Sequence, residues 1–180
     1  MTVALSVVAG VLVWTLLEYL LHRFVFHEQV LGRRPAVEHA EHHARVSWFA
    51  PWSAKLGLAA VVLPVLSALA WLVGGAGVGV PLVASVVASW LGYEALHRAI
   101  HVVAPRGPYG RWARRHHLHH HFRNPRANHG VTTPLWDAVF GTLERCPTVA
   151  VPRRHAAKLP WLVDAAGEID ARWAETYALR

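Results

Sequence analysis

The amino-acid sequence predicts an all-α integral membrane protein, in which a bundle of about three transmembrane helices carries a cytosolic helical cap with a dinuclear metal site. Three observations support this fold class: an apolar composition, three long apolar runs, and histidines that gather in four groups. Hydrophobic residues make up 54% of the 180 residues and charged residues 16%, with a mean hydropathy of +0.26. Soluble domains carry about 25% charged residues. The chain is therefore expected to form a single membrane-embedded domain over residues 1–180.

The apolar runs predict one helix followed by a helical hairpin. Residues 3–21 would extend about 28 Å as a helix, which is long enough to cross a bilayer. This run begins without a basic residue and continues into His22, so we expect a retained anchor and not a cleaved signal peptide. Residues 56–73 and 78–96 form two further runs, separated by the glycine-rich residues 74–77. A tight turn there would return the chain to the side of the membrane that it left.

Arginine indicates the orientation, because basic residues mark the cytoplasmic side of membrane segments. Both polar stretches beside the hairpin are rich in arginine, whereas the glycine-rich turn and the N-terminal run carry no basic residue. We therefore predict an integral protein of a bacterial inner membrane with its histidines on the cytoplasmic side. No basic segment has the spacing of a nucleic-acid-binding module, so nucleic acid is not an expected partner. Residues 148–180 should pack on the cytosolic face as a tail, and the single cysteine, Cys146, is expected to be inert.

Thirteen of the 14 histidines fall in four groups that apolar segments separate. Two groups contain the pattern His-x-x-His-His, the first at residues 39–43 and the second within residues 116–121. Residues three and four apart lie on one face of a helix, so each triplet presents three imidazoles together. The register of the second triplet is open, because a triplet that starts at His116 has the same spacing as one that starts at His117.

Two histidine pairs complete the pattern. His97 and His101 are four apart, which suits two ligands on one helix, whereas His22 and His27 are five apart and converge only if the helix ends or bends between them. Ten histidines exceed the roughly four to six ligands that one metal takes, so the spacing predicts two metals with about five imidazoles each. Imidazole binds iron, zinc, copper and nickel. Two metals in an all-nitrogen environment at a membrane face favour iron, and zinc would fit the same cage.

Carboxylates lie beside several of these histidines. Metal-bound imidazoles usually donate their second N–H to a carboxylate or a carbonyl. Four glutamates are candidates for that role, with exposed surface carboxylates as the open alternative: Glu18, Glu38, Glu41 and Glu94. His155 lies outside the four groups and is expected to be an ordinary surface or core residue.

Four segments combine the histidines with characteristic neighbours. They are Glu-Tyr-Leu-Leu-His-Arg-Phe-Val-Phe-His at 18–27, Glu-His-Ala-Glu-His-His at 38–43, Tyr-Glu-Ala-Leu-His-Arg-Ala-Ile-His at 93–101, and His-His-Leu-His-His-His-Phe at 116–122. Gly-Val-Thr-Thr, Leu-Trp-Asp and Phe-Gly-Thr follow between residues 130 and 142. In these segments the chain resembles the fatty acid hydroxylase and sterol desaturase superfamily of membrane diiron enzymes, and most of all the fatty acid 2-hydroxylases. The resemblance covers roughly residues 14–142.

The resemblance implies a set of metal ligands. In that family a phenylalanine follows directly on the last ligand pair, so Phe122 selects the triplet that starts at His117. His129 and Asp137 are implied to lie next to the ligands and not among them. The ten implied ligands are His22, His27, His39, His42, His43, His97, His101, His117, His120 and His121.

The resemblance also implies the reaction, which is O₂-dependent hydroxylation of an unactivated C–H bond in a fatty acyl chain or related lipid. Two iron ions would be the cofactors, O₂ the co-substrate, and the bilayer the source of the lipid. The sequence has one cysteine and no Gly-x-Gly-x-x-Gly, so we expect a separate electron donor, either a cytochrome b5-like protein or a ferredoxin with its reductase. An acidic donor, or alternatively anionic lipid headgroups, would suit a basic face that contains Arg106, Arg111, Arg114, Arg115, Arg123 and Arg126.

Other functions remain as alternatives. Carotenoid ring hydroxylases share the two triplets and the chain length, but their third box spaces its histidines by five, whereas His97 and His101 are four apart. Sterol or lipid desaturation would use the same ligand set. A membrane metal-binding or transport protein would place polar ligands along a path inside its spans, and the three apolar runs contain almost none.

Overall fold

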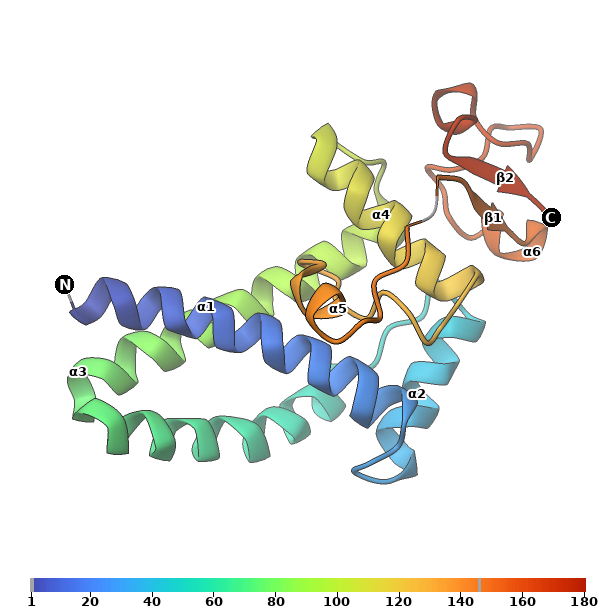
Figure 1. Ribbon diagram of the computed structural model, residues 1–180. Coiled ribbons are helices and arrows are strands. Elements are labelled where there is room, and N and C mark those ends of the chain that lie inside the picture. Colours follow the sequence, from blue (N-terminus) through green and yellow to red (C-terminus); the bar gives the residue numbers. More distant parts are fainter. Residues whose placement is uncertain (1, 146) are drawn as a thin grey trace.

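The computed structural model describes residues 2–145 and 147–180, so the expectation for Cys146 lies outside the described residues. The first part of the chain is helical: α1 (Thr2–Leu20), the π-helix η1 (Leu21–His27), α2 (Arg33–Ala44), α3 (Trp52–Val102), α4 (Gly107–Phe122) and α5 (Leu135–Val139). The tail contains β1 (Val149–Val151), α6 (Arg153–Ala156), the 3₁₀-helix η2 (Ala171–Trp173) and β2 (Tyr177–Leu179). The long helices extend to one side and the shorter elements gather at the other (Figure 1).

Two helical segments are long and apolar enough to cross a membrane, Val3–His27 and Trp52–Val102. Large apolar side chains on both segments are uncovered by protein, as in Leu5, which is 64% exposed, and Leu72, which is 82% exposed. Contiguous apolar surface of this kind is unfavourable in water and suits contact with lipid. The fold is thus a helical one that fits a membrane, as the composition predicted. The number of spans and the side on which the histidines lie stay predictions.

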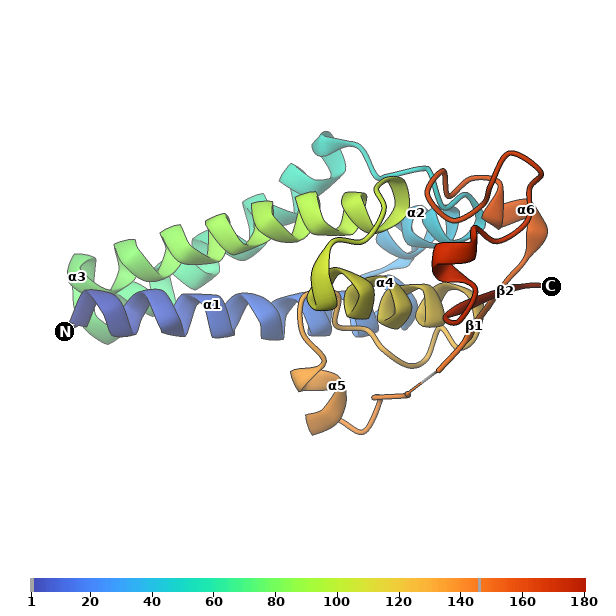
Figure 2. The same ribbon diagram turned by 90° about the horizontal axis from the view of Figure 1, so that it is seen from above.

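Helix α3 reverses direction at two glycines. Gly74 and Gly75 depart from helical geometry, and Gly75 has a φ of 57° and a ψ of −154°. Such a conformation is readily adopted only by a residue without a Cβ. Figures 1 and 2 show the two halves of α3 running back along each other from this point. The hairpin that residues 74–77 predicted is therefore present.

Small residues let α1 pack closely against the hairpin. A Cβ on Gly10 would overlap the hydroxyl of Ser85 and the carbonyl of Leu82 on α3. Ser6 and Ala70 are also buried on these helices. Small residues at helix crossings allow the close backbone approach that holds apolar helices together where water provides no driving force. This packing fixes the ends of α1 and α3 side by side.

Helices α2 and α4 lie at the end of the long helices that is opposite to the turn (Figures 1 and 2). Arg114 on α4 is buried, and its guanidinium donates hydrogen bonds to the carbonyls of Ala99, Val103 and Gly110. Two of these carbonyls belong to the last turn of α3 and its C-cap, where a cation is favourable. Arg114 therefore fixes α4 against α3. Its assignment to an exposed basic face was wrong.

The tail forms a small folded unit on α4. Strands β1 and β2 pair in parallel, with Val149 opposite Tyr177. Their buried side chains share a hydrophobic core with Leu118 and Phe122 of α4 and with Trp161. The prediction of an all-α chain fails for these strands, where the β-branched Val149 and Val151 bury one face and favour an extended backbone. The core holds the outer face of α4, and the opposite face carries the histidines described next.

Candidate metal centre

The segment Leu21–His27 is a π-helix, whose i to i+5 hydrogen bonds bring residues five apart over one another. His22 and His27 would diverge on an α-helix, but here their ring centroids are 5.2 Å apart. The two imidazoles converge without the predicted break between them, because one wide helical turn runs through both. The helix then ends at His27.

Each His-x-x-His-His triplet divides its imidazoles between two groups. On α2, His39 and His43 point to the first group and His42 to the second. On α4 the assignment is reversed, because His117 and His121 join His42 while the remaining histidine joins the first group. Around the helix axis, the i+4 side chain lies about 40° to one side of residue i, whereas the i+3 side chain lies about 60° to the other side. The i and i+4 imidazoles can therefore reach one group while the i+3 imidazole reaches the other.

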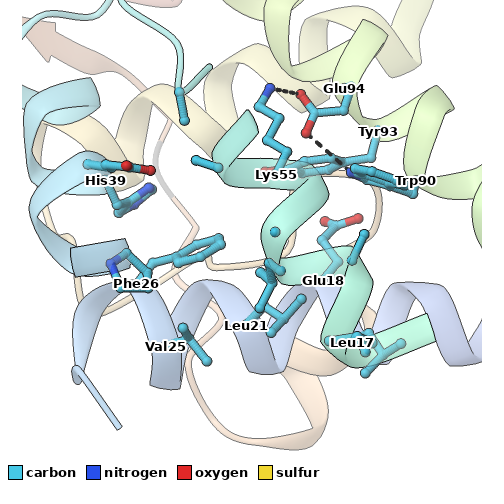
Figure 3. A pocket seen from close by; sticks show the side chains of 18 of the residues that line it. Leu17, Glu18, Leu21, Val25, Phe26, His39, Lys55, Trp90, Tyr93 and Glu94 are labelled. Carbon is cyan, nitrogen blue, oxygen red and sulfur yellow. Dashed lines mark hydrogen bonds and ion pairs between the residues drawn. The ribbon is translucent and has the colours of Figure 1, made fainter. Parts of the chain in front are cut away.

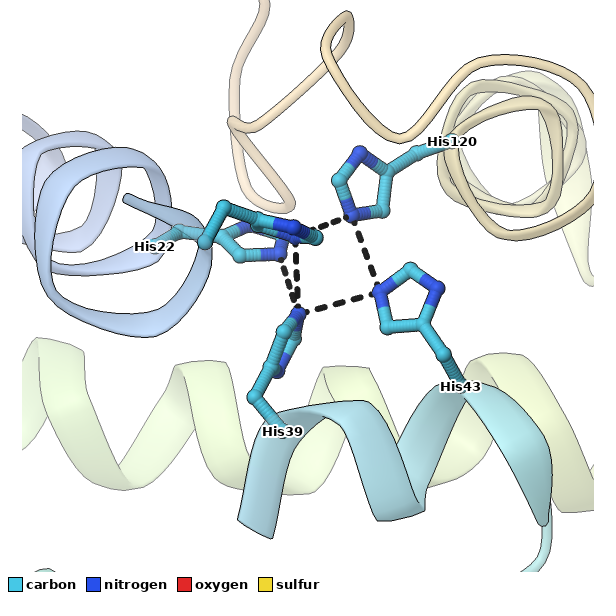
Figure 4. A group of neighbouring side chains, drawn as sticks. His22, His39, His43 and His120 are labelled. Atoms are coloured by element: carbon cyan, nitrogen blue, oxygen red, sulfur yellow. Dashed lines mark hydrogen bonds between the residues drawn. The ribbon is translucent and has the colours of Figure 1, made fainter. Parts of the chain in front are cut away.

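Two groups of five imidazoles result, and in each group one nitrogen per ring lies within 4.8 Å of the others. Helix η1 contributes only to the first group, α3 only to the second, and α2 and α4 to both. The rings of His43 and His121 stack at 4.1 Å where the groups meet. Four members of the first group are labelled in Figure 4. The first centre consists of His22, His27, His39, His43 and His120, and the second centre of His42, His97, His101, His117 and His121.

All ten histidines that the resemblance selected are thus brought together, and their role as ligands is taken up under the proposed function. Within the first centre, Nε2 of His39 lies 3.0 Å from Nε2 of His27 and 3.0 Å from Nε2 of His43. Within the second centre, Nε2 of His117 lies 3.1 Å from Nε2 of His97 and of His101. Each centre therefore has several ring nitrogens directed at one small space.

The opposite nitrogens of three rings identify their tautomers. Nδ1 of His22 donates to the carbonyl of His129, Nδ1 of His120 to the carbonyl of Ala127 at 2.7 Å, and Nδ1 of His42 to the carbonyl of Trp48 at 2.7 Å. A carbonyl only accepts, so the proton lies on Nδ1 and each Nε2 directs a lone pair into its centre. Converging lone pairs repel unless a cation lies between them. This donor set therefore fits a metal ion in each centre.

The electrostatic environment keeps these imidazoles neutral. Burial lowers the pKa of His39, His117 and His120 well below its usual value, and neighbouring imidazoles lower it further. Burial likewise lowers the pKa of His42 to about 4. Neutral imidazole is the form that binds metals. The centres are thus prepared for metal at neutral pH.

Asp137 holds the loop that supplies two of the three carbonyls. Its buried carboxylate accepts the N–H groups of His129 and Gly130 at 2.8 Å each and the hydroxyl of Thr142 at 2.7 Å. Although burial raises it, the pKa of Asp137 lies below its usual value because of these hydrogen bonds and one from His116. Asp137 was predicted to lie next to the histidines of the site. In the structure its carboxylate holds the backbone of His129, whose carbonyl in turn accepts from His22 of the first centre.

Glu18 holds the next part of the same loop. Its buried carboxylate accepts the N–H of Thr132 at 2.9 Å, the hydroxyl of Thr132 at 2.6 Å, and the N–H of Val131. Glu18 thus acts on a loop and not directly on an imidazole. The other three glutamates that the sequence singled out pair with basic residues: Glu38 with Arg34, Glu41 with Arg45, and Glu94 with Lys55.

The remaining histidines of α4 point to carboxylates. Nε2 of His116 lies 3.4 Å from Asp137, and Nε2 of His119 lies 2.8 Å from Glu144. The ring of His129 lies beside the first centre, with its centroid 5.4 Å from that of His22. Sequence reasoning missed Glu144 and the backbone carbonyls, since nothing in the residue pattern around them differs from an ordinary loop.

A cavity of about 500 Å³ leads from the apolar helices to both centres. Its walls come from the end of α1, η1, α2 and both halves of α3. Figure 3 shows Leu17, Leu21 and Phe26 on the α1 and η1 side of the cavity, with Phe26 next to His39. Most of the lining is apolar. His39 of the first centre and His42 and His97 of the second also line it. The cavity is therefore large enough for an elongated apolar ligand that would reach the metal-binding end.

Fold and site define a helical protein of membrane type with two all-imidazole centres beside an apolar cavity. Comparison with known proteins is more specific, since the model of the family named fatty acid hydroxylase matches residues 7–142. The chain belongs to the fatty acid hydroxylase family. The resemblance of its histidine segments to that family is thereby confirmed.

Individual relatives agree with this assignment. Dihydroceramide fatty acyl 2-hydroxylase FAH2 of Arabidopsis thaliana is 32% identical over 145 residues, which cover 78% of this chain and 61% of the relative. Human fatty acid 2-hydroxylase is 31% identical over 147 residues, 74% of this chain and 38% of the relative. A solved structure of scs7p, in which only the hydroxylase domain is visible, has a TM-score of 0.64 at 27% identity and covers 80% of this chain and 56% of its own. The chain thus spans about three fifths of the plant relative and under two fifths of the human one.

Proposed function

We propose that this protein is an O₂-dependent lipid hydroxylase in which the two groups of five imidazoles hold two iron ions. Iron bound there would supply the redox chemistry that activates O₂ for attack on an unactivated C–H bond. The ten histidines of the two centres would be the ligands, and zinc would fit the same positions in purified protein. His129 and Asp137 would hold and surround the first centre without binding metal.

One observation carries this proposal: the apolar cavity ends at imidazoles of both centres. A substrate in this cavity would present a carbon to the metals while its chain lies between α1 and the two halves of α3. Apolar walls exclude water from the reacting carbon, and Phe26 and Phe49 lie in the wall next to the histidines. These features support an acyl chain as the substrate. The names of the plant and human relatives specify the 2-position, and we propose the same position here.

The reaction consumes two electrons that a separate donor would deliver, either a cytochrome b5-like protein or a ferredoxin with its reductase. The exposed arginines at the α4 end, such as Arg111 and Arg115, would attract an acidic donor. We place this end on the cytoplasmic side of a bacterial inner membrane, because the arginine-rich segments gather there and the glycine turn lies at the opposite end. Residues 148–180 would then form a cytosolic tail of a single domain.

Comparative lipid mass spectrometry on cells tests the proposal. Cells that express the protein should contain a lipid with one additional oxygen, and His120→Ala should abolish it, because His120 lies at the first centre. His155→Ala is the matched control, since His155 contacts the carbonyl of Ala44 outside both centres. A lipid that loses two hydrogens instead would indicate desaturation. Identical extracts, even with an electron donor supplied, would overturn the proposed function, as would fewer than two metals per chain in purified protein.

A further inference from the structure

Side chains of the tail bind the carboxyl ends of two histidine-bearing helices. Helix α3 ends at Val102, one residue after His101, and α4 ends at Phe122, one residue after His121. Both histidines belong to the second centre. The tail lies beyond residues 7–142, which the family model matches, and it contacts both helix ends (Figure 2). These contacts connect the tail to the second centre.

Trp161 binds the end of α3. Its indole N–H donates to the carbonyl of Ile100 at 3.1 Å, and both residues are buried. Ile100 directly precedes His101, and its carbonyl is among the last four of the helix, which generally lack a partner within the helix. A buried carbonyl that is left without a donor costs free energy. The indole N–H therefore stabilises the turn of α3 that carries His101.

Arg180 binds the end of α4. Its guanidinium donates to the carbonyl of Phe122 at 2.7 Å, at a helix end where a cation is favourable. The backbone of Arg180 is itself held by β1 and α6, because its N–H donates to the carbonyl of Val151 and its carbonyl accepts from the N–H of Arg153, each at 3.0 Å. The guanidinium thus extends from an ordered backbone to the residue that follows His121.

The hydrophobic core of the tail holds Trp161 in place. The rings of Trp173 and Tyr177 meet its ring edge-on, with centroids 5.8 Å and 5.6 Å away. The guanidinium of Arg114, which fixes α4 against α3, lies 5.7 Å from the centre of the Trp161 ring. Trp161 therefore supports the junction of α3 and α4 both through its N–H and through its ring.

We propose that Trp161 and Arg180 are positioning residues of the second centre and raise its affinity for metal. Each orders the last turn of its helix, so that the imidazoles of His101 and His121 are already directed at the centre when a metal arrives. The tail contact nearest to the first centre is weaker, because His155 approaches the end of α2 at 3.2 Å in an exposed position. This inference rests on the proposed function, in which these histidines bind metal, and adds residues that hold them.

Conservative variants test the proposal. The full chain in phospholipid nanodiscs is loaded with cobalt(II), whose visible ligand-field absorption reports the geometry of its ligands, and is titrated with a chelator. Trp161→Phe keeps a ring and removes the N–H donor, so one of the two metals should bind about fivefold more weakly, with an altered absorption spectrum. Arg180→Met should weaken the same metal about threefold, since this guanidinium is partly in water, and Arg180→Lys should restore part of the loss. Trp173→Phe is the matched control, because it removes an indole hydrogen bond within the tail, to the carbonyl of Trp161.

Two backgrounds identify the centre that responds. A His120→Ala protein retains the second centre, and there Trp161→Phe should weaken the remaining metal about fivefold. A His97→Ala protein retains the first centre, and there Trp161→Phe should leave the affinity within about twofold of its parent. Equal weakening in both backgrounds would overturn the proposal, because the tail would then support the whole fold and not the second centre.

Hydrogen exchange of the metal-free protein reports on the helix end directly. The N–H of Val103 donates to the carbonyl of Ala99 at 3.0 Å in the last turn of α3. Trp161→Phe should increase the exchange rate of this N–H about fivefold. Native affinity for both metals in the Trp161→Phe and Arg180→Met proteins would overturn the proposal. A native protein that binds fewer than two metals would instead contradict the proposed function, and faster exchange at Val103 would still support the ordering of α3 by Trp161.

Discussion

Asp137→Asn should weaken metal binding mainly at the first centre and affect the second centre less. In the native protein the backbone nitrogens of His129 and Gly130 each lie 2.8 Å from one carboxylate oxygen of Asp137. The asparagine amide keeps one accepting oxygen, and its NH₂ group would face one of these two N–H groups and could not accept from it. Loss of one hydrogen bond to a charged acceptor, with a buried N–H left unsatisfied, costs about 2 to 3 kcal/mol. The loop then no longer holds the carbonyl that orients His22. Loss of such an orienting partner lowers metal affinity roughly 10- to 100-fold.

Competition with a chromophoric chelator measures this effect. Purified protein that carries two metals per chain is titrated with the chelator, and the metal released is followed by absorbance. We expect one of the two metals of the Asp137→Asn protein to be released at a clearly lower chelator concentration, and the other at a concentration closer to that of the native protein. Asp164→Asn is the matched control, because Asp164 also accepts two backbone N–H groups, those of Ala166 and Glu168, but in the tail. Equal weakening of both metals, or no weakening of either, would refute the reasoning.

Three further predictions concern ligand register, pH and packing. His119→Ala should retain both metals while His120→Ala loses one, as counted by elemental analysis; equal loss in both proteins would mean that the register is wrong. Burial lowers the pKa of His42 from its ordinary value near 6.5 to about 4 in the metal-free protein, so the stability that the neutral ring contributes is complete above about pH 6.5 and decreases as the pH falls toward 4. Thermal unfolding of chelator-treated protein between pH 7.5 and 4.5 measures this, and a melting temperature constant over that range would contradict it. Gly10→Ala should destabilise the protein by about 1–3 kcal/mol, since the added methyl overlaps the carbonyl of Leu82; Gly57→Ala, with open space around it, is the control in the same unfolding assay.

Local spacing was sufficient to predict much of this molecule. The glycines at 74–77 predicted the hairpin because a reversal needs a residue that tolerates positive φ, and Gly75 has that conformation. The three- and four-residue spacings predicted which imidazoles share a helix face, because helix geometry is nearly the same in every protein. These features depend on a few neighbouring residues, so a single sequence reveals them.

Features that depend on distant contacts were not predictable in the same way. The π-helix of Leu21–His27 adds one residue to a turn, and nothing in the local residues requires it over an α-helix. The division of each triplet between two centres depends on where η1 and α3 approach α2 and α4. The carbonyls of Trp48 and Ala127 act through the backbone, so residue identity carries no sign of their role. Arg114 was misassigned because exposure and burial of an arginine look alike in sequence.

The sharing of α2 and α4 between the two centres has a consequence for how the metals enter. A metal bound by His39, His43 and His120 in the first centre also fixes the relative position of these two helices. Binding of the first metal orders α2 and α4, so binding of the second metal costs less conformational entropy. The first metal should therefore increase the affinity of the protein for the second metal. Loading is therefore expected to be cooperative, and chains with one metal should be scarce at half saturation compared with chains that carry two or none.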